Sequence, residues 1–84
     1  MSQLVVDSIT AVRVRRPIGI QVTLINQSAT DVFYDREPNR LNASVAGAVP
    51  SGTKLAATTG IVQLENFPGE MWFRSATPTT IEVV

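Results

Sequence analysis

Apolar and polar residues alternate with a period of two along nearly the whole of this 84-residue chain. No convincing stretch places apolar residues at helical spacing. The clearest alternation spans residues 18–24, in which every second side chain is an isoleucine, a valine or a leucine. Successive side chains of a strand point to opposite faces, so this run predicts a strand with one buried face, formed by Ile18, Ile20, Val22 and Leu24. The pattern as a whole predicts an all-β protein.

More short runs of this kind are separated by residues that favour turns. Strands are predicted at residues 9–16, 18–24, 31–35, 61–67, 71–76 and 79–84. Strands this short and this closely spaced favour a small antiparallel β-sandwich or barrel, which we expect to contain about 6–8 strands. Alternation puts Ile81 and Val83 on a buried face and separates Phe33 from Val32 and Tyr34.

Turn-forming residues indicate how the strands connect. Asn26-Gln27-Ser28 predicts a turn, after which residues 31–35 pair antiparallel with residues 18–24. Pro68-Gly69 is the strongest hairpin signal, and it predicts that the strand before it pairs with the strand after it.

The length of the chain indicates a single domain, because a chain this short buries only about 60% of the surface that its unfolded form exposes. We divide it into residues 1–16, an N-terminal strand or arm, and residues 17–84, a β-sandwich domain. Residues 36–60 are expected to form a long loop, in which residues 44–49 carry a weak strand pattern and Pro50-Ser51-Gly52 a turn. Loops beyond about 12–15 residues are usually functional or mobile.

Histidine and cysteine are both absent from the sequence. They supply most proton shuttles, thiolate nucleophiles and transition-metal ligands, so their absence argues against the commonest enzyme and zinc-site classes. Asp31, Asp35 and Glu37 leave open a carboxylate pair or a calcium site, against the simpler interpretation of a solvated strand end. Serines such as Ser28 have no histidine to activate them, which leaves Lys54 as a base. We expect no enzymatic activity, no metal and no cofactor.

The seven basic and seven acidic residues give a formal net charge of zero. Such a chain has no overall field that attracts nucleic acid or an anionic membrane. No apolar run approaches the ~20 residues of a membrane span, and the first residues lack the features of a signal peptide. We therefore expect a soluble protein, made in the cytoplasm, that binds neither nucleic acid nor membrane.

Arg13, Arg15 and Arg16 form the only basic cluster in the sequence. One interpretation is a patch that binds an acidic partner surface or a phosphate. The other is a charged edge strand, which blocks aggregation through strand pairing.

Large apolar residues occupy both faces of one predicted strand, because Met71, Trp72 and Phe73 are consecutive. Trp72 therefore lies either in the core or in an interface, where tryptophan often anchors binding. The same argument applies to Phe33. The candidate partner-binding residues are Arg13, Arg15, Arg16, Phe33, Arg36, Arg40 and Trp72.

The order of several short segments is distinctive. A strand ending in Asn26 is followed by Ala-Thr-Asp-Val-Phe-Tyr at residues 29–34, then by a Gly/Ser/Thr-rich loop and the turn Pro50-Ser51-Gly52. Next comes a large aromatic followed by small residues, within residues 69–76, and the chain closes on a Thr-rich strand at residues 79–84. This succession resembles small virion proteins of tailed bacteriophages.

The resemblance covers residues 20–84 and implies a β-sandwich that decorates or cements the capsid. On this basis we expect a structural virion protein that binds and stabilises a phage capsid shell, with the major capsid protein or another virion protein as its partner. A homo-oligomer is expected, with a trimer favoured because shells offer three-fold positions. If residues 1–16 form an arm, we expect them to add a strand to the exposed sheet edge of a neighbouring subunit. The alternative is a tail or fibre recognition module that binds a host receptor or glycan.

Overall fold

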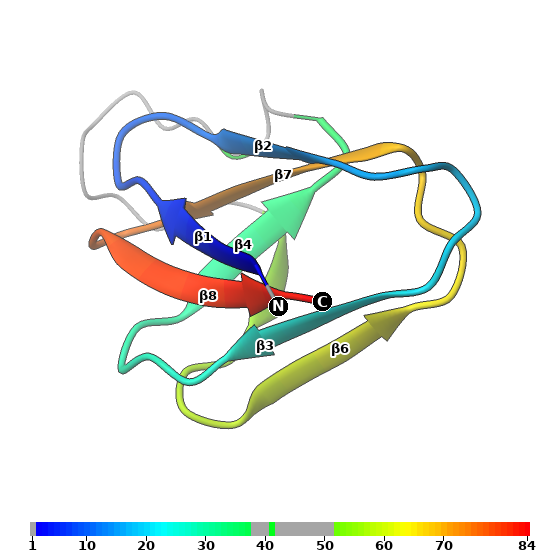
Figure 1. Ribbon diagram of the computed structural model, residues 1–84. Helices are drawn as coiled ribbons and strands as arrows, with labels where there is room; N and C mark the ends of the chain where they lie inside the picture. The colour runs from blue at the N-terminus through cyan, green and yellow to red at the C-terminus, as the bar shows by residue number, and fades with distance from the viewer. Residues whose placement is uncertain (1, 38–40, 42–51) are drawn as a thin grey trace.

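The computed structural model describes residues 2–37, 41 and 52–84, which form eight β-strands in two four-stranded antiparallel sheets (Figure 1). Sheet A has the order β1 (Ser2–Val6), β8 (Thr79–Val83), β3 (Val22–Asn26) and β6 (Gly60–Leu64). Sheet B has the order β2 (Val12–Arg15), β7 (Glu70–Ser75), β4 (Val32–Asp35) and β5 (Thr53–Leu55). The two sheets pack together as a small β-sandwich, which confirms the predicted fold class.

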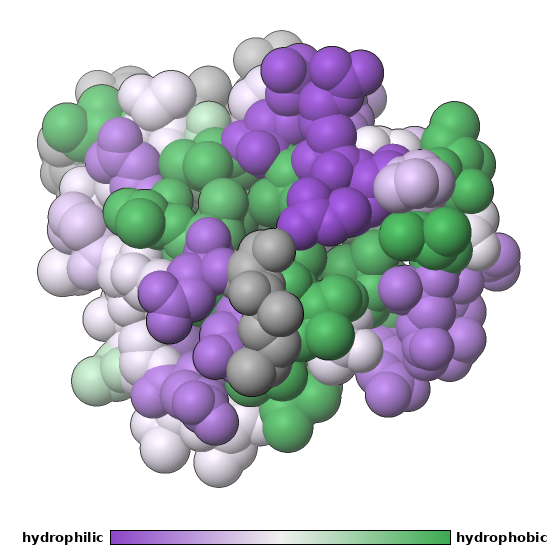
Figure 2. All heavy atoms as spheres, in the orientation of Figure 1, coloured by the Kyte–Doolittle hydropathy of each residue, from purple (hydrophilic) through white to green (hydrophobic). Residues whose placement is uncertain are grey.

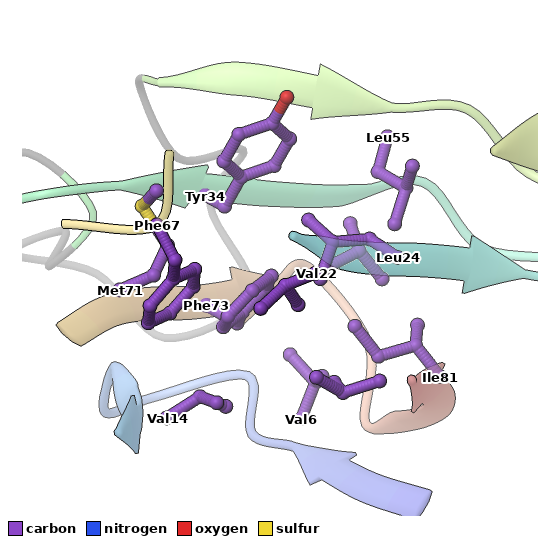
Figure 3. Close-up of a cluster of buried hydrophobic side chains, with 12 residues drawn as sticks. Val6, Val14, Val22, Leu24, Tyr34, Leu55, Phe67, Met71, Phe73 and Ile81 are labelled. Carbon is purple, nitrogen blue, oxygen red and sulfur yellow. The ribbon is translucent and has the colours of Figure 1, made fainter. Parts of the chain in front are cut away.

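Alternate residues of both sheets point into one hydrophobic core (Figure 3). In β3 the buried apolar side chains are Val22 and Leu24, and in β7 they are Met71 and Phe73. Fully burying one such side chain contributes about 1.5–3 kcal/mol to folding. The core cluster consists of Val6, Val14, Val22, Leu24, Val32, Tyr34, Leu55, Phe67, Met71, Phe73, Ile81 and Val83.

The alternation correctly separates the two faces of these strands, and the inward direction predicted for Ile81 and Val83 is confirmed. Ile81 and Val83 are buried, and Tyr34 lies on the core side of β4 while Phe33 lies on the opposite side. The rings of Tyr34 and Phe73 meet across the paired strands β4 and β7, with centroids 5.9 Å apart and planes tilted by 35°. Such tilted aromatic pairs add to the stability that burial alone provides.

The predicted strand beginning at Ile18 is too long, since β3 begins only at Val22. Ile18 and Ile20, predicted to face the core, are 82% and 39% exposed. The cause is the turn before the strand, where Gly19 has a φ of 86° and interrupts the extended backbone. Alternation assigns side chains to faces only while the chain stays extended, so the pattern fails there.

The predicted pairing of residues 31–35 with the preceding strand is wrong, because β4 lies in sheet B and β3 in sheet A. The connection between them is organised by Asn26, whose side chain is buried. Its Nδ2 donates to the carbonyl oxygens of Thr30 at 2.9 Å and Leu55 at 3.0 Å, and its Oδ1 accepts from the N–H and hydroxyl of Ser28. These hydrogen bonds fix the turn that follows β3, and this turn directs the chain into β4 of sheet B.

The predicted hairpin at Pro68-Gly69 is also wrong, since β6 and β7 belong to different sheets. The chain turns a corner there, and its backbone pairs with the connection between β2 and β3. The N–H of Phe67 donates to the Ile20 carbonyl at 3.0 Å, and the Phe67 carbonyl accepts from the N–H of Gly19 at 2.9 Å. A proline-glycine turn suits a hairpin and a corner equally, so it does not identify the partner strand.

Residues 2–16 contain one edge strand of each sheet. β1 pairs with β8 along its whole length, and β2 pairs with β7 from Val12 to Arg15. In this structure, the N-terminal stretch therefore contributes strands to the sandwich of its own chain.

The predicted loop at residues 36–60 is partly strand. Thr53–Leu55 forms β5, which pairs with β4, and Gly60 begins β6. Three residues are too few for alternation to reveal a strand, although Leu55 is buried in the core. The predicted weak strand at residues 44–49 lies outside the described residues, as do Pro50 and Ser51 of the predicted turn.

Replacing Leu24 or Phe73 with alanine should lower the free energy of unfolding by about 2–5 kcal/mol, because both side chains are completely buried. The matched control is Ile18→Ala, which removes an exposed side chain and should change stability by less than about 0.5 kcal/mol. Chemical denaturation of the three variants measures these values. A loss for Ile18→Ala as large as for Leu24→Ala would contradict the core described above.

Burial raises the pKa of the Tyr34 hydroxyl above its usual value of about 10. The folded state therefore favours the protonated form, so this contribution to stability is complete below about pH 10 and is lost as the pH rises through the raised pKa. Tyr34 is the only tyrosine, so tyrosinate absorbance reports its titration directly. We expect a midpoint above that of the unfolded chain, and an alkaline loss of stability that Tyr34→Phe removes. A midpoint equal to that of the unfolded chain would disprove this.

Candidate functional site

The outward side of sheet B carries most of the candidate partner-binding residues. Strand pairing aligns them in rows, so that Arg13 of β2 lies opposite Trp72 of β7, which lies opposite Asp35 of β4. The neighbouring row places Phe33 opposite Arg74. We call this surface the sheet-B outer face, and it comprises Arg13, Arg15, Phe33, Asp35, Lys54, Glu70, Trp72 and Arg74.

Arg13 lies between an aromatic and an acidic neighbour on this face. Its guanidinium carbon is 5.7 Å from the centroid of the Trp72 ring. Its Nη1 is 3.8 Å from Oε2 of Glu70, and both side chains are about half exposed. The cation–π contact contributes about 0.5–1 kcal/mol and the ion pair at most about 1 kcal/mol, so their main effect is to orient Arg13 over the ring. Hydrophilic side chains gather over β2 in Figure 2.

Trp72 lies outside the core cluster and is half-buried on the sheet-B outer face. It is carried by β7, which is paired on one side with β2 and on the other with β4. The backbone beneath the ring is therefore fixed from both sides. Phe33 is also half-buried on this face, so the surface combines two aromatic rings with charges of both signs.

Arg74 is buried on the same face, although its position on β7 points it away from the core. Its Nε and Nη2 donate to the carbonyl oxygen of Ser8 at 3.1 and 2.6 Å, and its Nη1 donates to that of Leu41 at 2.7 Å. Leu41 is itself buried. Charge-assisted bonds of this kind offset the cost of burying a cation. Arg74 thus ties Leu41 to the turn that follows β1.

Arg16 and Arg36 lie apart from this face, at the end of the sandwich where the β2–β3 and β6–β7 connections meet. Arg36 is exposed and lines an open hollow that also contains Ile18 and Phe67. Arg16 lines a second hollow with Ile18, and its Nη1 donates to the Arg15 carbonyl at 2.8 Å.

The predicted partner-binding residues therefore fall on two surfaces. Those on the sheet-B outer face are Arg13, Arg15, Phe33 and Trp72. Arg16 and Arg36 lie at the end of the sandwich where the β2–β3 and β6–β7 connections meet. Arg15 also lines the hollow that contains Arg16. Arg40 lies outside the described residues.

Glu70, Arg74 and Ile18 lie on these surfaces but were not among the predicted partner-binding residues. Glu70 and Arg74 alternate with Trp72 along β7, so their outward direction follows from the same pattern. The burial of Arg74 depends on Ser8 and Leu41, which lie far from it in the sequence and give no local signal. Ile18 was predicted to face the core, and the sequence signal that could have indicated its exposure is Gly19, the residue that follows it.

Two of the carboxylates considered for catalysis or calcium binding, Asp31 and Asp35, accept hydrogen bonds from the backbone. Oδ1 of Asp31 accepts from the N–H of Ala57 at 2.7 Å, and Oδ1 of Asp35 accepts from the N–H of Glu37 at 3.0 Å. Within the described part of the chain, no group of three acidic, histidine or cysteine side chains is placed to hold a metal ion. The hydroxyl of Ser28 bonds to Asn26 and Thr30 within the turn that follows β3.

Comparison of the chain with protein-family models, with curated protein sequences and with solved structures finds no match. Among residues 2–37, 41 and 52–84, no helix is long and apolar enough to cross a membrane.

Replacing Arg74 with methionine should lower the free energy of unfolding by about 2–4 kcal/mol, because the carbonyl oxygens of Ser8 and Leu41 lose their donors. Arg74→Lys keeps the charge without the planar fork and should lie between wild type and Arg74→Met. Arg15→Met is the control, since Arg15 is exposed. Chemical denaturation that gives equal stabilities for Arg74→Met and Arg15→Met would show that these bonds do not stabilise the fold.

Proposed function

We propose that this protein is a non-enzymatic structural component of a tailed-phage particle, which binds and stabilises the capsid shell through the sheet-B outer face. The virion assignment is supported by the order of segments over residues 20–84, which resembles that of small phage virion proteins. The β-sandwich fold is consistent with that group. The choice of surface is supported by the geometry of Arg13 and Trp72.

The observation that carries the proposal is the Arg13–Trp72 pair on paired strands, with a separation of 5.7 Å. Tryptophan and arginine are among the residues most enriched at the positions that dominate binding energy in protein interfaces. Both side chains are oriented before any partner arrives, because β7 is paired on both sides and Glu70 directs Arg13. Groups that are already ordered lose less conformational entropy on binding.

The mechanism is attachment of many copies to a repeating surface. A contact of standard size buries about 800 Å² per partner, a large share of the surface of so small a domain. Where copies are linked, each further contact forms at high effective concentration, so a modest affinity per site gives lasting attachment. A net charge of zero limits repulsion between neighbouring copies.

The same surface supports a second candidate function, a tail or fibre module that binds a host receptor or glycan. Its basis is the row formed by Arg13, Trp72 and Asp35, which places polar groups on both sides of an aromatic ring. An aromatic ring with polar neighbours offers an apolar platform and hydrogen-bonding groups to a sugar. A protein with this function binds a receptor or glycan and does not need the capsid shell as its partner.

Purified protein should be mixed with undecorated capsid shells of the virus that carries it, and binding measured by co-sedimentation and by the melting temperature of the particles. We expect saturation at a fixed ratio to shell subunits and a higher melting temperature. Trp72→Ala should weaken binding by about 30-fold or more, because it removes an interface anchor of about 2 kcal/mol. Gln3→Ala, an exposed change on sheet A, is the matched control.

Failure of the wild-type protein to bind shells would reject the capsid role. In that case, binding to a glycan array that is lost in Trp72→Ala and kept in Gln3→Ala would support the recognition module. Shell binding that is equally strong in both variants would retain the capsid role and move the contact away from the sheet-B outer face.

A further inference from the structure

β6 is an edge strand of sheet A, and its outer edge carries free backbone groups. Thr23 of β3 exchanges two hydrogen bonds with Val84, at 3.0 and 2.9 Å, so the backbone groups of Thr23 point towards β8. Alternate residues of an antiparallel strand bond to opposite sides, so Leu24 bonds towards β6, where it pairs with Val62. The N–H and C=O groups of Ile61 and Gln63 therefore point away from β3, where no described residue pairs with them.

This edge also lacks the features by which proteins block strand addition, such as charged side chains, prolines and very short strands. β2, an edge of sheet B, carries Arg13 and Arg15, while β5 is only three residues long and carries Lys54. β6 is Gly-Ile-Val-Gln-Leu, with no charged residue, and its Ile61 side chain is 65% exposed.

The remaining edge strand, β1, is also uncharged, but its surroundings differ. Its exposed Val5 lies opposite Thr80 of β8. In contrast, Ile61 lies opposite Ile25 of β3, so two isoleucines adjoin on the outer side of sheet A next to the free edge. Of the two uncharged edges, β6 therefore offers apolar surface as well as free backbone groups.

We propose that β6 pairs antiparallel with β6 of a second copy of this chain, about a two-fold axis at Val62. Ile61 then exchanges hydrogen bonds with Gln63 of the second copy, and Gln63 with Ile61 of the second copy. Since both residues point their backbone groups outward, this register satisfies both chains in the same way. The two A sheets become one continuous sheet.

The electrostatics of this register are favourable. Glu65, the first charged residue after β6, falls opposite Thr59 of the second copy, so no like charges face each other. On the outer side, Ile61 gains cover from Gln63 of the second copy on one side while keeping Ile25 on the other. Lys54 of β5 belongs to the outer face of the other sheet.

Five residues per strand make a small contact, well below the standard interface of about 800 Å² per partner. We therefore expect a weak and reversible dimer, with a dissociation constant between about 10 µM and 1 mM. The inference does not depend on the proposed capsid role, since it uses a different sheet.

Two double variants that change the same two exposed positions test the register. In Ile61→Lys/Gln63→Lys, two pairs of like charges face each other across the two-fold axis. In Ile61→Lys/Gln63→Glu, the same axis brings two lysine–glutamate pairs together. Sedimentation equilibrium up to about 1 mM should show a dissociation constant at least about 10-fold weaker for the first variant than for the second, which should dimerise as well as wild type or better. Circular dichroism checks that both variants fold.

A wild-type protein that stays monomeric at about 1 mM would refute the proposal. Equal dimerisation of the two double variants would also refute it, because only paired β6 strands place position 61 of one copy opposite position 63 of the other. Gln3→Lys/Val5→Lys places charges on β1, and loss of the dimer in that variant alone would assign the contact to β1 instead. The Ile61→Lys/Gln63→Lys variant should still bind capsid shells, because the capsid role is assigned to the sheet-B outer face. Measuring its shell binding therefore tests the dimer and the capsid role independently.

Discussion

The buried amide of Asn26 joins the two sheets, and the course of the chain depends on it. Asn26 ends β3 in sheet A, yet its Nδ2 donates to the carbonyl of Leu55 in sheet B as well as to that of Thr30. All four of its hydrogen bonds are made inside the protein, two of them to Ser28. A buried polar group without partners costs several kcal/mol, so this arrangement fixes the position of the turn. β4 and β5 are thereby placed across the core from β3.

Much of the strand content and the side-chain directions were predictable from the sequence, whereas the strand partners were not. Alternation depends only on the extended backbone of each segment, so it correctly placed Trp72 on the face opposite Phe73. Which of the two faces is the outer one became clear only from the structure, where Phe73 is buried in the core and Trp72 is half-buried outside it. Partner choice depends on contacts between distant segments, such as those of Asn26, and the expected hairpins were accordingly wrong. Ile18 shows the other limit, since a single left-handed glycine removed it from the pattern.

The candidate site was predictable to the extent that it follows from strand periodicity. Arg13, Arg15, Phe33 and Trp72 were selected separately, and only the pairing of β2, β7 and β4 brings them onto one surface. The role of Arg74 could not be foreseen, because its acceptors are the carbonyls of Ser8 and Leu41. Main-chain acceptors exist at every residue, so the sequence contains no mark of which ones a buried arginine will use.

The charged side chains of the strands lie mainly on sheet B. Sheet B carries arginines, acids and aromatic rings, while the strands of sheet A carry one charged residue, Glu82 of β8, among mainly threonine, glutamine and aliphatic residues. Trp72, the only tryptophan, lies on sheet B beside Arg13. Its fluorescence is therefore an intrinsic reporter of that side alone. Emission should respond when a ligand covers Arg13 and stay constant when β6 acquires a neighbour, so the two surfaces can be followed separately in unlabelled protein.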